Sequence, residues 1–178
     1  MPDFLQSGFF VAYRLKPTAM LQQELFLFQE IPLYLSHLHS NLPARWGTMN
    51  ACQMLAHLND FFRLSINELS MEAVTTADQW PKYQAFIYSD RFFRENTKAP
   101  MLPDTPEPCP FESIEAARSA LLDQIKRFKL YFEENPASEI LHPVFGWLNY
   151  EGWVRLHYKH CVHHLRQFNL LPETTLAV

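Results

Sequence analysis

The chain has 178 residues, of which 48% are hydrophobic and 15% aromatic, which excludes a disordered protein and suffices for one well-packed core. Its formal net charge of -4 lacks the basic excess that a phosphate backbone demands, so we expect no nucleic-acid partner. No apolar run approaches the roughly 20 residues that span a bilayer, so no membrane association is expected. We predict a single domain over residues 1–178, in which 1–17 form an N-terminal arm of undecided conformation.

The first predicted helix covers residues 18–39, and Thr18 is placed to cap it. Pro32 lacks an amide hydrogen and its ring clashes with the preceding turn. We therefore expect this helix to kink or restart near Ile31. Residues 40–47 then form a turn.

The second predicted helix begins at Asn50. Asparagine is a favoured N-cap, and Gln53, three residues later, completes a capping box. His57 follows at the flank of an apolar face. That face consists of Met54, Leu55, Leu58, Phe61, Phe62, Ile66 and Leu69.

Residues 70–110 are less regular and contain five prolines between 100 and 110. Some helix is expected over 83–94, but the proline-rich part is typical of a long connection across the surface. Ser113 is placed to cap a third long helix that ends before Pro136. No convincing alternation of polar and apolar residues indicates a strand.

The last predicted helix is capped by Asn149, after a loop that contains His142 and Gly146. The total is four main helices, with a long crossover between the second and the third. We therefore predict an all-α fold and, within it, a four-helix bundle.

Three stripes run along this last helix at helical spacing. Arg155, Lys159, Val162, Arg166 and Asn169 form a mostly charged stripe, which we expect to face solvent. Val154, Tyr158, Cys161, Leu165 and Phe168 form an apolar stripe, which we expect to face the core. Trp153, His157, His160, His164, Gln167 and Leu171 form a third stripe beside the apolar one, so its imidazoles are expected to be partly buried.

Several buried polar rings need partners, because an unpaired buried polar group costs free energy. His160 and His164 are four residues apart, which brings both rings within reach of one metal ion. His57 on the second helix is the natural third ligand. We predict a divalent metal site at these three histidines; the alternative is that they are hydrogen-bonded core residues.

Other residues are candidates for the surroundings of this site. His157 is either a contact of the ligands or a packed histidine, and Gln167, Trp153 and Gln53 are expected near the ligands or the pocket. We predict no catalytic residues beyond the metal ligands, because no Ser-His-Asp order and no paired carboxylates are present.

Three cysteines, Cys52, Cys109 and Cys161, are too few and too scattered to predict a disulfide framework or a C-x-x-C zinc site. The N-terminus also lacks the pattern of a secretory signal. We therefore predict a cytoplasmic protein with reduced thiols, in which Cys161 is a small buried hydrophobe.

Two motifs resemble the DinB-like superfamily, and within it a family of unknown function. They are R-W-G-T-M-N-A-C-Q-M-L-A-H-L at 45–58 and H-P-V-F-G-W-L-N-Y-E-G-W-V-R-L-H-Y-K-H-C-V-H-H-L-R-Q-F at 142–168. The resemblance implies an up-down-down-up bundle that holds a divalent metal, zinc or nickel, through His57, His160 and His164, with Gln167 lining the site. Asn50 and Gly152 depart from the family pattern, where serine and glutamate are expected.

The resemblance also implies what such a site does. Some superfamily members are bacillithiol-type S-transferases or mycothiol-dependent isomerases, so we predict a metal-dependent hydrolase or thiol transferase that activates water or a thiol. Its expected partners are a small-molecule substrate, such as a low-molecular-weight thiol, and by analogy a second copy of the chain. The alternative is a non-catalytic or stress-associated bundle with a structural metal, and the sequence leaves open whether the protein is catalytic.

Overall fold

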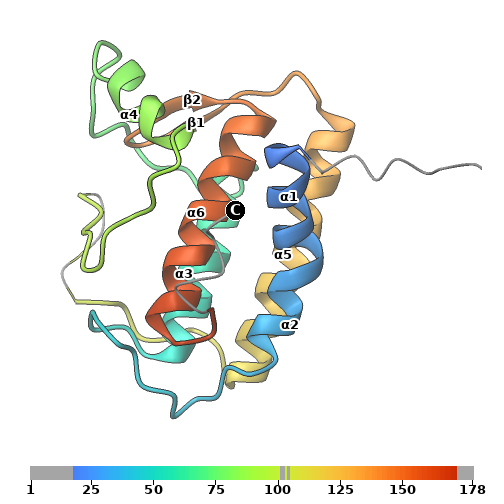
Figure 1. Ribbon diagram of the computed structural model, residues 1–178, viewed down its shortest axis with the longest axis vertical. Helices are drawn as coiled ribbons and strands as arrows, with labels where there is room; N and C mark the ends of the chain where they lie inside the picture. The colour runs from blue at the N-terminus through green and yellow to red at the C-terminus, as the bar shows by residue number, and fades with distance from the viewer. Residues whose placement is uncertain (1–17, 101–102, 104, 172–178) are drawn as a thin grey trace, which may run out of the picture.

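The computed structural model describes residues 18–100, 103 and 105–171, so the predicted arm at 1–17 lies outside the described part. The described chain is mostly helical, as predicted, with one small sheet, and its long helices lie side by side (Figure 1). The predicted up-down-down-up order stays a prediction. None of the described helices is long and apolar enough to cross a membrane. The elements in chain order are α1 (Ala19–Leu25), the π-helical turn η1 (Phe26–Glu30), α2 (Ile31–Leu35), α3 (Ala51–Leu64), α4 (Trp80–Ile87), α5 (Ile114–Glu134), β1 (Ile140–His142), β2 (Gly146–Leu148) and α6 (Tyr150–Gln167).

The first predicted helix forms as three consecutive pieces. Thr18 caps α1 by accepting a hydrogen bond from the Leu21 amide at 3.3 Å. The π-helical turn η1 precedes Pro32, which lies in the first turn of α2. A proline in the first turn removes an amide that would have no helical partner there, so the restart near Ile31 is as predicted.

The other long helices begin where their capping residues predict. The Asn50 side chain accepts from the Gln53 amide and the Gln53 side chain accepts from the Asn50 amide, both at 2.9 Å, which completes the capping box of α3. The side chains of Ser113 and Asn149 cap α5 and α6 by accepting from the amides of Ala116 and Gly152, without a reciprocal bond. α3 ends at Leu64, earlier than its apolar pattern implied.

A single core fills the space between these helices. α3 packs against α5 and α6, and α1 packs against α6. The largest fully buried side chains are Trp153, Phe62, Phe128, Phe168, Leu27, Ile31, Leu35, Leu38, Met54, Leu55, Leu58 and Ile87. The face of α3 that contacts α6 therefore lies inside the molecule, and His57 lies on that helix.

The expected loop before α6 is instead a short antiparallel hairpin, in which Ile140 pairs with Leu148. The Nδ1 atom of His142 accepts hydrogen bonds from the amides of the turn, at 3.0 and 3.3 Å. Gly146 has a φ of +73°, and a Cβ atom there would lie 2.3 Å from the Trp80 ring. The prediction of no strand was wrong here because each strand has three residues, too few to show an alternating pattern.

The charged stripe of α6 is partly covered rather than solvated. Lys159 is only 2% exposed, and its Nζ atom donates to the carbonyl oxygens of Ser89 and Arg91, both at 2.5 Å. Burial lowers the pKa of Lys159 to about 8. Val162 is also buried. α4 ends at Ile87 rather than near residue 94. The prediction failed at these two positions because the segment that follows α4 packs on this side of α6.

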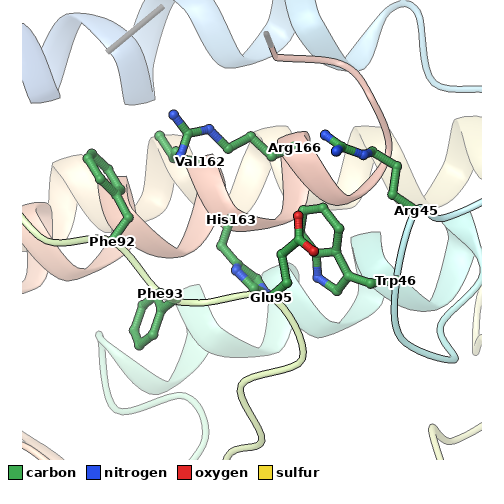
Figure 2. Close-up of a pocket in the computed structure, with 8 residues that line it drawn as sticks. All are labelled: Arg45, Trp46, Phe92, Phe93, Glu95, Val162, His163 and Arg166. Carbon is green, nitrogen blue, oxygen red and sulfur yellow. The ribbon is translucent and has the colours of Figure 1, made fainter. Parts of the chain in front are cut away.

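That segment and the loop before α3 enclose a cavity of about 320 Å³ beside α6 (Figure 2). Trp46 comes from the loop, and Phe93 and Glu95 come from the segment after α4. His163 of α6 forms part of the wall between them. The cavity therefore lies next to the helix that carries four of the chain's eight histidines.

The cysteines form a bond that was not predicted. Cys52 in the first turn of α3 is joined by a disulfide to Cys109 in the proline-rich connection, 57 residues along the chain. Cys161 is free and buried, as expected. Because structural disulfides are typical of oxidising compartments, the cysteines do not support the predicted cytoplasmic location, which stays a prediction.

Candidate metal centre

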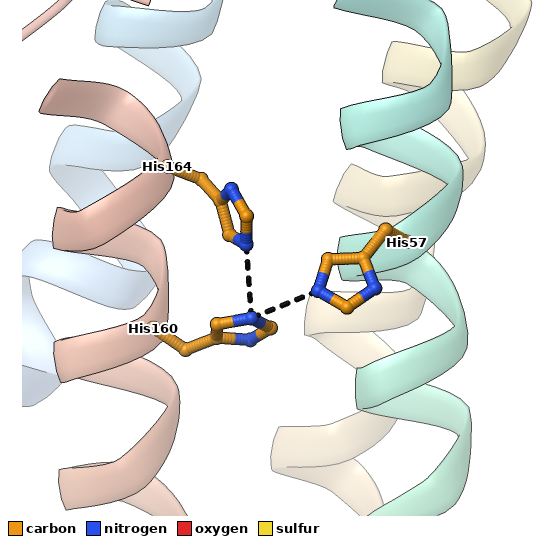
Figure 3. A group of neighbouring side chains, drawn as sticks. All are labelled: His57, His160 and His164. Atoms are coloured by element: carbon orange, nitrogen blue, oxygen red, sulfur yellow. Dashed lines mark hydrogen bonds between the residues drawn. The ribbon is translucent and has the colours of Figure 1, made fainter. Parts of the chain in front are cut away.

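Three histidines converge between α3 and α6 (Figure 3). The Nε2 atom of His160 lies 2.9 Å from Nε2 of His57 and 3.0 Å from Nε2 of His164. Ligand atoms of all three side chains lie within 4.8 Å of one another. The structure therefore brings together the three histidines that the sequence singled out.

Gln167 determines which nitrogen of His164 carries the proton. Its Nε2 atom donates to the carbonyl oxygen of Trp46 at 2.7 Å, so its Oε1 atom faces Nδ1 of His164, also at 2.7 Å. An amide oxygen can only accept, so Nδ1 of His164 is the protonated nitrogen. Nε2 of His164 therefore presents a lone pair to the other two rings.

Hydrogen bonds alone do not satisfy the contacts around His160. A neutral ring nitrogen has either one hydrogen or one lone pair, so Nε2 of His160 can make one good hydrogen bond with its two neighbours. If Nε2 of His160 donates its hydrogen to Nε2 of His164, that hydrogen is not available to His57. If Nε2 of His160 instead accepts a hydrogen bond from His57, its lone pair faces the lone pair on Nε2 of His164. A cation at the common point resolves this conflict.

Burial keeps all three rings neutral. It lowers the pKa of His57 to about 4, with a smaller opposing effect of Asp60. Burial, followed by the neighbouring histidines, holds the pKa values of His160 and His164 well below the usual range. Although His57 and His160 keep some accessible surface as residues, the protein surrounds their imidazole rings densely. Neutral imidazoles are the form that binds metal ions.

The two short distances between ligand nitrogens, together with the donor set, are those expected for a divalent ion. Zinc binds imidazole nitrogen at about 2.0–2.1 Å, so two nitrogens on one ion at 90–110° lie about 2.9–3.4 Å apart. The two short contacts, 2.9 and 3.0 Å, fall in that range. Imidazole ligands suit zinc, nickel, copper and iron alike, so the ligands do not select the metal.

The His160 ring is oriented by packing. Its centroid is 4.4 Å from that of Phe61 and 6.2 Å from that of Phe93. Its Nδ1 atom is buried and has no hydrogen-bond partner among the described residues. His160 therefore differs from His164, whose Nδ1 atom is held by a side chain.

His157 is a packed histidine rather than a neighbour of the converging nitrogens. Its ring stacks on Phe62 with centroids 3.7 Å apart, and its Nε2 atom is 2.9 Å from the Ser65 hydroxyl. Trp153 packs against the edge of Phe61 and against His157. Both residues support the core next to the cluster, and Phe61 lies between them and His160.

Gln53 makes its hydrogen bonds at the start of α3. Besides completing the capping box, its Nε2 atom donates to the carbonyl oxygen of Glu107 at 2.8 Å. It therefore fastens the proline-rich connection to α3, near the disulfide. Its hydrogen bonds join it to Asn50 and to the proline-rich connection, and its expected place near the ligands or the pocket stays a prediction.

Two residues next to Gln167 escaped the sequence interpretation. The sequence indicated no contact between Trp46 and Gln167, but the Trp46 carbonyl oxygen orients the Gln167 amide. Gly47 has a φ of +77°, and a Cβ atom there would lie 2.8 Å from Nε2 of Gln167. The adjacent W-G pair in the 45–58 motif was the available signal, because glycine is favoured where φ is positive.

Fold and cluster together define a mostly helical protein with three histidines that could hold a metal ion. A family model described as the DinB superfamily matches residues 36–168, more than half of the chain. The chain therefore belongs to the DinB superfamily. No curated protein and no solved structure matches it. The matched range includes all three histidines and Gln167.

Replacing Gln167 tests its role in orienting His164. Gln167→Leu removes the acceptor for the Nδ1 proton, and we expect zinc affinity to fall about 10- to 100-fold, as for other residues that support metal-binding histidines. The measurement is a zinc titration in competition with a chromogenic chelator. Gln53→Leu is the matched control, since the hydrogen bonds of the Gln53 side chain go to Asn50 and the proline-rich connection. Equal affinities for the two variants would contradict the role of Gln167.

Proposed function

We propose that the chain is a metal-dependent enzyme in which His57, His160 and His164 hold a divalent ion, zinc or nickel. The proposed reaction is hydrolysis or thiol transfer on a small molecule. The observation that carries the proposal is the convergence of three neutral Nε2 atoms, which hydrogen bonding alone does not satisfy. Membership of the DinB superfamily supports it.

Three protein ligands are typical of catalytic rather than structural zinc sites, because a further position stays open. When bound, a divalent ion would supply Lewis-acid activation of water or of a thiol. Neutral imidazoles would leave its positive charge uncompensated.

The chain's own residues would orient the ligands and restrict water. Gln167 holds His164, while the rings of Phe61 and Phe93 lie against His160. Asp60, the carboxylate nearest to His57 along α3, pairs with Arg63 at 2.9 Å. Activation of the substrate is therefore assigned to the ion rather than to this carboxylate.

A structural role for the metal is the second candidate. Its support is that the three histidines come from α3 and α6, so a bound ion would join two helices of the core. A structural ion has a closed coordination sphere, whereas a catalytic ion accepts an added ligand. The two candidates therefore differ in a measurable property.

Cobalt substitution tests the proposal, because the visible spectrum of Co²⁺ responds to changes in its ligands. Azide and 2-mercaptoethanol are added to the Co²⁺ form of a Cys52→Ser/Cys109→Ser variant, which excludes exchange with the disulfide. We expect azide to change the spectrum and the thiol to add a near-ultraviolet charge-transfer band. A Co²⁺ spectrum that responds to neither ligand would establish a closed, structural site. His160→Ala is the control without a complete ligand set.

A further inference from the structure

An irregular segment packs on α6 beside the histidine cluster. This segment, residues 88–95, follows α4 and contains no helix or strand, and we call it the strap. The ring centroid of Phe93 in the strap lies 6.2 Å from that of His160 and 6.0 Å from that of His163. The Phe93 backbone is also hydrogen-bonded to His163. Figure 2 shows Phe92 and Phe93 on this segment, next to α6.

A buried lysine of α6 fastens the strap. Nζ of Lys159 donates to the carbonyl oxygens of Ser89 and Arg91, both at 2.5 Å. The same atom lies 5.0 Å from the ring centroid of Phe86 and 5.2 Å from that of Phe92. Hydrogen bonds from a charged donor are stronger than neutral ones, and an ammonium group is attracted to the faces of aromatic rings. One side chain therefore holds both the backbone and the side chains of the strap against α6.

The strap is the part of the enclosure that opens most easily. The other ring that lies closely against His160 is that of Phe61 in α3. α3 and α6 are long helices whose facing sides belong to the core. The strap has no such ladder of hydrogen bonds, and Tyr88, Asp90, Arg91, Arg94 and Glu95 in it are exposed. Irregular segments of this kind open at a lower free energy than core helices. A molecule would therefore reach the buried nitrogens by displacing the strap rather than by separating α3 from α6.

We propose that the strap is a gate over the histidine cluster and that Lys159 is the residue that keeps this gate shut. When the Lys159 hydrogen bonds break, water can satisfy the ammonium group and the two carbonyl oxygens, and Phe93 can leave His160. Lys159 is thus a positioning residue that acts on His160 through Phe93. The identity of the admitted molecule as a metal ion or a substrate rests on the proposed function, whereas the closure of the strap does not.

Chemical labelling of the metal-free protein measures this closure. Diethyl pyrocarbonate reacts with neutral imidazole nitrogens that it can reach, and tandem mass spectrometry identifies each labelled histidine. Lys159→Met keeps an unbranched side chain between the aromatic rings and removes the ammonium group. We expect Lys159→Met to raise the labelling rate of His160 at least tenfold over the wild type. An unchanged rate at His160 would overturn the proposal.

Two other histidines calibrate the labelling in the same sample. His157 lies one helical turn before His160 but stacks on Phe62 in the core, so its labelling rate should not change. His39 is exposed and should react equally in all variants. The matched control is Lys126→Met at an exposed lysine of α5, which should behave as the wild type. An equal increase at His157 and His160 would show a general loosening of the fold and overturn the proposal.

Phe93→Ala keeps the test decisive if Lys159→Met does not fold. This variant leaves the fastening in place and removes the strap ring that lies next to His160. We expect the labelling rate of His160 to rise and that of His157 to stay the same. No rise at His160 would show that the strap does not cover the cluster.

The rate of zinc release extends the test to the proposed metal. We expect Lys159→Met to lose zinc to an excess of chelator at least tenfold faster than the wild type. Removal of a positive charge near a cation would by itself slow the release, so the direction of the change separates a gate from a simple charge effect. Slower or unchanged release would overturn the proposal. If the wild type binds no zinc, the proposed metal site fails, and the labelling of His160 alone decides whether the strap is a gate.

Discussion

Zinc added to the metal-free wild-type protein is expected to raise its thermal unfolding midpoint by about 5–10 °C. A ligand that binds only the folded state at 100 times its Kd contributes about 2.7 kcal/mol. For a chain of this size, each kcal/mol shifts the midpoint by about 2–4 °C. Calorimetry or circular dichroism, with and without zinc, measures the shift. Nickel is expected to act in the same direction, because imidazole accommodates both ions.

His160→Ala is expected to abolish this stabilisation, because Nε2 of His160 is the atom that both other histidines approach. Elemental analysis of untagged protein should then find stoichiometric metal in the wild type and little in the variant. His39→Ala, which removes an exposed histidine, is the matched control and should behave as the wild type. An undiminished zinc effect in His160→Ala would place the ion elsewhere. No zinc or nickel effect in the wild type would leave the three histidines as core residues.

Loss of the Cys52–Cys109 disulfide is expected to lower the free energy of unfolding by about 2–4 kcal/mol. The bond closes a loop with a sequence separation of 57, and the loss of chain entropy in the unfolded state is the main source of such stabilisation. Urea unfolding of the wild type and of Cys52→Ser/Cys109→Ser measures the difference. Adding a reductant should destabilise the wild type and leave the double variant unchanged.

A thiol count tests whether this bond is present. The unreduced, denatured wild type should show one reactive thiol, Cys161, out of its three cysteines. Three reactive thiols would show that the purified protein lacks the disulfide. The hydrogen bond from Gln53 to the Glu107 carbonyl holds the same connection against α3. We therefore expect the double variant to remain folded.

Local patterns in the sequence predicted where the long helices begin and identified His57, His160 and His164 as the candidate ligands. Asn50, Ser113 and Asn149 cap their helices because a short polar side chain can reach the free amides of the next turn. His160 and His164 share one side of α6 because residues four apart lie about one helical turn apart. These relations depend only on neighbouring residues, so the sequence suffices to read them.

Only the tertiary structure decided which surfaces are covered and which distant residues meet. Lys159 belongs to a polar stripe by its spacing, yet the carbonyl oxygens of Ser89 and Arg91 surround its ammonium group. The cavity, the hydrogen bond from Gln167 to the Trp46 carbonyl and the Cys52–Cys109 bond likewise join segments far apart in the chain. Residue spacing within one helix determines which side chains share a face, whereas the packing of the other segments determines what that face contacts.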